Sequence, residues 1–258
     1  MNDKTTIIEV FLHLIKKHPE LLGMHPSTGA LDYSNLERKL GLKSTSYYSK
    51  DLNCVLANLC DYYGSDKGEI KSSDHPYPWP SHSYTDYYRR LFWHSRESVK
   101  KVFECGLGTN NPNLPSSMGA SGKPGASLRV WRDYFPNAMI YGGDIDKNIL
   151  FSEERIETFY LDQLDPVAIE KFWLQVNEES FDFMIDDGLH IFEAGSSLFI
   201  NSIEKLSSSG IYVIEDVNKQ DLIRYEEFFA QKNYLVDYVV MSAPNFPSDN
   251  NLVVVRKA

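Results

Sequence analysis

Two short apolar segments that each lead directly into carboxylates constrain this chain more than any other feature. Residues 181–185 and 210–214 are almost wholly apolar, as expected of buried parallel strands. The first is followed by Asp186-Asp187-Gly188-Leu189-His190 and the second by Glu215-Asp216. Because the carboxyl ends of strands in an open α/β sheet face one crevice, these side chains should lie together. The pattern predicts a metal site with a histidine beside it.

Strand patterns alternate with helix patterns along most of the chain. This alternation implies right-handed crossovers and a parallel sheet. The end differs, because residues 235–241 and 252–256 flank a turn-rich stretch and predict an antiparallel hairpin at the sheet edge. We therefore predict an α/β fold with a mostly parallel, seven-stranded sheet. The remaining predicted strands are 99–105, 139–143, 156–161, 181–185 and 210–214, and the predicted helices are 84–96, 167–176, 192–206 and 221–232.

The chain divides into three predicted parts. Its 258 residues fit one α/β domain with an additional segment better than two independent domains. Residues 1–61 read as an N-terminal helical segment, residues 62–98 as a loop with a leading helix, and residues 99–258 as the sheet domain. Aromatic residues lie among the prolines of the loop, so it cannot form regular helix. The loop is either a surface strap packed by its own aromatic residues or a lid over a substrate.

Composition narrows the classes of partner. The formal net charge of −10 disfavours a nucleic-acid partner, because binding to phosphate backbones needs a basic surface. Three cysteines without a CxxC pair indicate reduced thiols and a cytoplasmic protein. The apolar residues 7–15 are interrupted by Glu9 and His13 and are too short to span a bilayer, so no membrane insertion is expected. We expect an amphipathic helix there that packs on the domain or on a second subunit, as in a homodimer.

The first predicted strand of the sheet domain ends in Glu104, Gly106 and Gly108. Glycines at this place let the backbone approach a ligand closely. A nicotinamide dinucleotide fingerprint would have a third glycine at position 111, where this chain has Asn111, so that cofactor is disfavoured.

Acidic residues also end the next two predicted strands. Asp144, with Asp146 close behind, is placed to accept the hydroxyls of a ribose. Asp162, followed by Gln163, is placed to address an adenine amino group. Together with the glycine motif, these residues predict a cofactor that carries adenosine.

These motifs together resemble class I S-adenosylmethionine-dependent methyltransferases. The greatest similarity is to the metal-dependent sugar O-methyltransferases of macrolide biosynthesis and their cephalosporin hydroxylase-like relatives. The resemblance covers residues 60–217 well and implies a Rossmann-like class I methyltransferase fold with S-adenosylmethionine and Mg²⁺ as cofactors. It rests on residues 104–108, 125–136 (Gly-Ala-Ser-Leu-Arg-Val-Trp-Arg-Asp-Tyr-Phe-Pro), 144–146, 186–190 and 214–216.

The resemblance also implies roles for individual residues. Asp187, Glu215 and Asp216 would hold Mg²⁺, and His190, together with Asp187, would be catalytic. Carboxylate oxygens suit Mg²⁺, and coordination lowers the pKa of a hydroxyl that a nearby imidazole can deprotonate. The alternative is that Glu215 and Asp216 cap the following segment and that His190 is a loop histidine with satisfied hydrogen bonds. Further expected cofactor contacts are Ser127 and Asp186, and expected substrate contacts are Tyr62, His82 and Tyr84.

The expected activity is methyl transfer to a hydroxyl of a sugar or nucleotide-sugar, in surface-polysaccharide or secondary-metabolite biosynthesis. Residues 110–124 form a longer loop than the family usually has, which would reshape the methionine end of the cofactor pocket or the substrate wall. Three alternatives remain open from the residues alone. They are a non-sugar acceptor such as a phosphoramidate or an antibiotic precursor, an NAD-dependent oxidoreductase, and a non-catalytic pathway partner.

Overall fold

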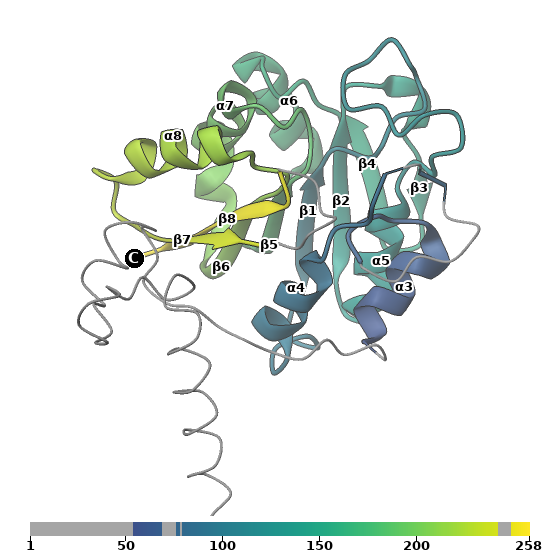
Figure 1. Cartoon of the computed structure of the whole chain (residues 1–258), viewed down its shortest axis with the longest axis horizontal. Coiled ribbons are helices and arrows are strands. Elements are labelled where there is room, and N and C mark those ends of the chain that lie inside the picture. The colour runs from purple at the N-terminus through teal and green to yellow at the C-terminus, as the bar shows by residue number, and fades with distance from the viewer. Residues whose placement is uncertain (1–53, 69–75, 78, 242–248) are drawn as a thin grey trace, which may run out of the picture. The chain divides into compact units, whose positions relative to one another are not determined.

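The computed structural model describes residues 54–68, 76–77, 79–241 and 249–258, which all lie in the compact unit Lys50–Ala258. An eight-stranded sheet forms the centre of this unit, in the order β3-β4-β2-β1-β5-β6-β8-β7 (Figure 1). The predicted helix at residues 7–15, with its expected dimer contact, lies outside the described residues. The strands are β1 (Lys101–Cys105), β2 (Met139–Asp144), β3 (Ser152–Glu153), β4 (Ile156–Tyr160), β5 (Phe181–Asp186), β6 (Leu206–Ile214), β7 (Tyr234–Val240) and β8 (Asn251–Lys257).

The pairing of the strands confirms the predicted α/β fold. β1 lies parallel to β2 and β5, β4 lies parallel to β2, and β6 lies parallel to β5. β8 enters between β6 and β7 and is antiparallel to both, which is the predicted C-terminal hairpin. The additional strand β3 pairs antiparallel with β4 and has only two residues, too few for a periodic pattern in the sequence.

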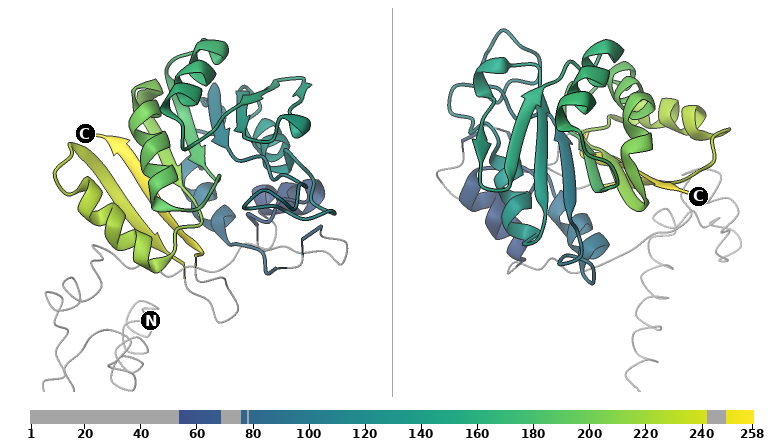
Figure 2. Two further views of the ribbon diagram at one scale, coloured as in Figure 1. Left: turned by 90° about the horizontal axis from the view of Figure 1, so that it is seen from above. Right: turned by 180° about the vertical axis from the view of Figure 1, so that it is seen from behind.

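Helices cover both faces of the sheet (Figure 2). Buried side chains of α3, α4 and α5 form one hydrophobic cluster, and those of α6, α7 and α8 form the other. The two clusters use alternate residues of the central strands, because successive strand residues point to opposite faces. The helices are α3 (Val55–Tyr63), α4 (Tyr84–Phe92), α5 (Ala126–Tyr134), α6 (Pro166–Val176), α7 (Phe192–Ser202) and α8 (Lys219–Phe229).

Helix boundaries follow local capping chemistry. The Asp165 side chain accepts a hydrogen bond from the Val167 amide at the start of α6, and Pro166 occupies the first turn. The predicted helix 192–206 ends earlier, at Ser202, because a short 3₁₀ turn and then Leu206, the first residue of β6, follow it. Helix α3, part of which the sequence assigned to the N-terminal segment, packs with its buried side chains in the first hydrophobic cluster.

Candidate functional site

The carboxyl ends of β1, β5 and β6 lie side by side and bring the predicted acidic residues together. Cys105 pairs with Asp186 across β1 and β5, and the Asp187 amide donates to the Cys105 carbonyl oxygen at 2.9 Å. The Glu215 amide donates to the Asp186 carbonyl oxygen, also at 2.9 Å. Sheet pairing therefore continues one residue beyond the strands and fixes the backbone from which these carboxylates project.

Asp187, His190 and Asp216 form the candidate metal centre. One ligand atom from each lies within 4.8 Å of the others. His190 Nε2 lies 3.4 Å from Asp187 Oδ1, and His190 Nδ1 lies 3.5 Å from Asp216 Oδ2. Two carboxylates and an imidazole around one point suit a divalent cation, with oxygens as the hard ligands that Mg²⁺ prefers.

Backbone conformation at this centre is unusual. His190 (φ 58°) and Asp216 (φ 54°) both adopt left-handed conformations. Such conformations are uncommon outside glycine and concentrate at functional sites, where the surrounding structure holds them. Two of the three residues of the candidate centre are therefore held in conformations that local preference does not favour.

The charge around His190 determines its protonation. Burial alone would lower its pKa, but the neighbouring Asp216 and Asp187 carboxylates raise the pKa to about 10. Burial likewise would raise the pKa of Asp187, yet Lys67 and His190 hold it well below its usual range. The two carboxylates therefore favour the protonated form of the imidazole.

Glu215, which the sequence placed among the metal ligands, points elsewhere. Tyr88 donates a short hydrogen bond to its Oε1, and the Lys67 ammonium donates one to its Oε2. Glu215 is 1% exposed and is not part of the group formed by Asp187, His190 and Asp216. In the structure this residue binds groups of the protein with both oxygens.

Lys67 is the main site residue that sequence reasoning missed. Its side chain is 2% exposed, and its Nζ lies 2.5 Å from Asp187 Oδ2 and 3.3 Å from Glu104 Oε1, in addition to its contact with Glu215. Burial would lower the pKa of Lys67, but these carboxylates raise it well above its usual value. Lys67 lies five residues after Tyr62, which the resemblance named as a substrate contact, but no pattern in the sequence indicated a role for the lysine itself.

Glu104, near the end of β1, is linked to the candidate centre through Lys67. Trp131 Nε1 donates to its Oε2 at 2.8 Å, and the Ser127 side chain lies beside it at the start of α5. Burial raises the pKa of Glu104 to about 7, although Lys67 opposes the rise. Its neighbours are protein groups from α5 and Lys67.

Two of the predicted substrate residues border the centre. Tyr84 donates to Asp216 Oδ1 at 2.5 Å, and His82 Nε2 lies 3.6 Å from the same atom. The rings of His82 and Tyr84 stack with centroids 4.7 Å apart. The side chain of Tyr62, in contrast, is 75% exposed, and its ring packs edge-on against that of Tyr63.

The glycine motif approaches the candidate centre closely. A Cβ on Gly106 (φ 92°) would lie 1.9 Å from the Asp187 carbonyl oxygen, and one on Gly108 (φ 77°) would lie 2.9 Å from Met118 Cγ. Only glycine fits these two conformations without strain. Helix α5 begins at Ala126, well beyond Gly108, so no helix N-terminus follows the glycines directly as it does in a dinucleotide fingerprint.

The acidic residues at the end of β2 and just after it hold this motif in place. Asp144 accepts from the Leu107 amide at 2.7 Å and from the Asp146 amide at 2.8 Å, and Asp146 accepts from the Thr109 hydroxyl at 2.5 Å. Both oxygens of Asp144 are thus engaged by the backbone. The predicted ribose contacts also shape the loop that follows β1.

The side chains of Gln163, which lies shortly after β4, and of Asp186, at the end of β5, contact each other. The Gln163 side chain donates a short hydrogen bond to Asp186 Oδ1 and accepts from the Leu189 amide at 3.0 Å. Burial raises the pKa of Asp186 to about 7. Asp162 accepts from the Leu164 amide at 3.0 Å, as in an Asx turn. The described partners of these predicted cofactor residues are protein groups.

Two exposed apolar side chains accompany the predicted adenosine contacts. Ile145 (46% exposed) follows Asp144, and Leu164 (50% exposed) follows Gln163. Each of them leaves apolar area at the surface next to a predicted adenosine contact. Sequence reasoning did not single them out, since burial cannot be read from a single apolar residue after a strand.

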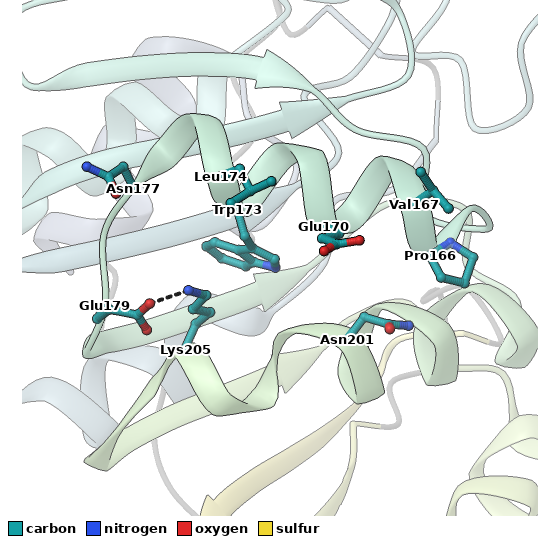
Figure 3. Close-up of a pocket in the computed structure, with 9 residues that line it drawn as sticks. All are labelled: Pro166, Val167, Glu170, Trp173, Leu174, Asn177, Glu179, Asn201 and Lys205. Atoms are coloured by element: carbon teal, nitrogen blue, oxygen red, sulfur yellow. Dashed lines mark hydrogen bonds and ion pairs between the residues drawn. The ribbon is translucent and has the colours of Figure 1, made fainter.

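A separate groove lies between α6 and α7 (Figure 3). Trp173 and Leu174 line it, together with Glu179 and Lys205, which form an ion pair. None of the predicted site residues lines this groove.

The helices in the part of the chain that the structure describes include none with the length and apolar character of a membrane span.

Comparison with known proteins identifies curated relatives. The chain is 32% identical over 162 residues to the 8-demethyl-8-alpha-L-rhamnosyl tetracenomycin-C 2'-O-methyltransferase of Streptomyces olivaceus, a match that covers 63% of this chain and 37% of that protein. It is 34% identical over 165 residues to the demethylmacrocin O-methyltransferase of Streptomyces fradiae, covering 63% and 39%. The chain thus matches less than two-fifths of the length of these relatives. No family model matches it.

A solved structure shares the architecture. The MycE methyltransferase from the mycinamycin biosynthetic pathway, in complex with Mg and SAH, superposes with a TM-score of 0.56 at 24% identity. The superposition covers 78% of this chain and 54% of that chain.

Proposed function

Because this chain has the class I methyltransferase fold and has sugar O-methyltransferases among its homologues, we propose that it transfers a methyl group from S-adenosylmethionine to a sugar hydroxyl with the help of Mg²⁺. One observation carries the proposal. Asp187, His190 and Asp216 converge beside the glycine motif, so a bound cation and a base would lie next to the place expected for the cofactor.

The residues of the centre fit the proposed cation. Asp187 and Asp216 supply carboxylate oxygens, and the ligand atoms around them lie within 4.8 Å of one another. Hard oxygen ligands in an incomplete set suit Mg²⁺, which keeps positions open for substrate oxygens. Glu215 would become a ligand only by exchanging its contacts with Lys67 and Tyr88.

The surface near the glycine motif fits the proposed cofactor. Ile145 and Leu164 offer apolar contact to an adenine, and Asp162 lies between the strand end and Leu164. The cofactor would supply the methyl group, and the cation would lower the pKa of the acceptor hydroxyl. His190 would take the hydroxyl proton at a ring nitrogen, and Tyr84 would orient Asp216 through its hydrogen bond.

The acceptor is proposed as a sugar carried on a small molecule. The names of both curated relatives describe O-methylation, and one specifies a rhamnosyl group. Nucleotide-activated sugars and sugars of bacterial surface polysaccharides are further members of the same acceptor class. The His82–Tyr84 ring pair beside Asp216 would contact the sugar.

A turnover assay with glycosides and nucleotide-sugars tests the proposal. Formation of S-adenosylhomocysteine should require both an acceptor and Mg²⁺ and should stop with EDTA. Asp187→Asn should lower turnover by about 100-fold or more, because it removes a ligand of the cation, while S-adenosylhomocysteine still binds. Glu179→Gln, a change to an exposed ion pair away from the centre, is the matched control. Full activity of the Asp187→Asn protein would exclude the metal role.

A further inference from the structure

Lys67 is a buried cation that belongs to none of the groups with a proposed chemical role. It follows α3 in a loop whose backbone is fixed at both ends. Gly64, in a left-handed conformation, ends α3 by donating to the Cys60 carbonyl oxygen, and the Thr85 amide donates to the Lys67 carbonyl oxygen at 3.3 Å. The side chain therefore extends from an anchored segment across the carboxyl edge of the sheet.

The contacts of Lys67 join three strands. Its ammonium lies against Glu104 at the end of β1, Asp187 after β5 and Glu215 after β6. A lysine that is 2% exposed needs charged partners, because an unpaired ammonium in a dry interior is very costly. The carboxylates need it equally, since with Asp216 they would otherwise place four acidic groups together.

The two oxygens of Asp187 are divided between two cationic groups. Oδ1 faces His190 at 3.4 Å, within the candidate metal centre, while Oδ2 accepts from Lys67 at 2.5 Å. Glu215 is held by Lys67 and Tyr88 outside that centre. A divalent ion coordinated by Asp187 would thus share this carboxylate with the Lys67 ammonium. An ion coordinated by Glu215 would displace the ammonium from that residue.

From this geometry we propose that Lys67 is a positioning residue that competes with the divalent cation for Asp187 and Glu215. The inference rests on the proposed metal centre and adds the residue that sets its affinity. Lys67 holds the carboxylates in place when the metal is absent, and its positive charge repels the divalent cation when that ion binds. The same ammonium contacts Glu104, so the competition also affects a residue of β1, the strand that leads into the glycine motif.

Neutral substitutions of Lys67 test the competition through metal affinity. We expect Lys67→Met to bind Mn²⁺ roughly tenfold or more tightly than the wild type, because like charges in a partly dry site repel strongly. Loss of a purely structural lysine would instead weaken metal binding or leave it unchanged. Lys67→Arg, which retains the charge, should bind Mn²⁺ with an affinity near that of the wild type.

The measurement is a titration of the full chain with Mn²⁺, in which electron paramagnetic resonance detects the free ion. Lys205→Met, which removes an ion-paired lysine on the α7 side of the molecule, is the matched control and should not change the affinity. Lys67→Gln, whose amide still donates a hydrogen bond, keeps the test available if Lys67→Met does not fold. Binding of S-adenosylhomocysteine checks the fold of each variant.

The outcomes separate this inference from the proposed function. Tighter binding by the neutral variants and unchanged binding by Lys67→Arg would support the competition. Equal or weaker binding by a folded neutral variant would overturn it and leave the methyltransferase proposal standing. A wild-type chain that binds no Mn²⁺ would overturn the metal role in the proposed function and the competition with it.

Discussion

The protonation of His190 offers a direct test of the electrostatics at the candidate centre. In the metal-free protein, Asp187 and Asp216 lie 3.4 and 3.5 Å from its ring nitrogens and raise its pKa from 6.5 to about 10. At 1.36 kcal/mol per pKa unit, this rise corresponds to about 5 kcal/mol. A histidine with that pKa carries a proton at neutral pH and cannot act as a base.

A cation held by the same two carboxylates would cancel most of this effect. We expect Mg²⁺ to lower the pKa of His190 by about two pH units or more, because it neutralises the charges that stabilise the imidazolium. Asp216→Asn, which leaves one of the two carboxylates, should by itself bring the pKa to about 8. Metal binding would then convert His190 into an effective base near neutral pH.

Two-dimensional ¹H–¹⁵N spectra of protein with ¹⁵N-labelled histidine, recorded across pH with and without Mg²⁺, measure these values directly. His190→Gln assigns the resonance. If His190 titrates near 6.5 in the metal-free protein, the charge argument is refuted. An elevated pKa that Mg²⁺ leaves unchanged would instead refute the placement of the cation.

The same pKa predicts a dependence of stability on pH. The folded-state pKa of about 10 lies above the ordinary value of 6.5. His190 therefore contributes stability that is fully present below pH 6.5 and is lost as the pH rises to about 10. Urea unfolding of metal-free wild type and His190→Gln should show a difference in free energy that shrinks across this window.

Three further substitutions test the glycine motif and the loop that follows it. Gly106→Ala should lower the free energy of unfolding by about 3 kcal/mol or more, because the new Cβ meets the Asp187 carbonyl oxygen in a left-handed conformation, and urea titration measures this. Gly119→Ala, also left-handed but with no atom within 4 Å, should cost only about 1 kcal/mol, and equal losses would contradict the close approach. Asp144→Asn should weaken S-adenosylhomocysteine binding about tenfold in calorimetry. The two backbone amides that now donate to the charged carboxylate would lose this acceptor, and the loop would be held less firmly. Unchanged affinity would show that the loop holds its shape without this carboxylate.

Much of the fold was predictable because its signals are local. The apolar segments of β1, β2, β4, β5 and β6 are bounded by acidic or glycine residues, and the chain spacing between them fits helical crossovers. The two-residue strand β3 was missed because it carries no periodic pattern.

The sequence by itself determined that carboxylates would gather at one edge of the sheet. Parallel strands place their carboxyl ends together, so Asp187 and Asp216 were expected to be neighbours, and His190 follows Asp187 at a short distance along the chain. These three residues meet in the structure.

Only the tertiary structure decided how the charges are shared. Lys67 is 120 residues from Asp187 and 148 from Glu215, and no local pattern indicates which carboxylates a loop lysine reaches. Glu215 and Asp216 are adjacent in sequence but point to different partners, because residues that follow one another at a strand end project to different sides and Asp216 is left-handed. Local periodicity thus places the carboxylates at the edge, whereas packing of the α3 loop and α4 against that edge selects the partner of each one.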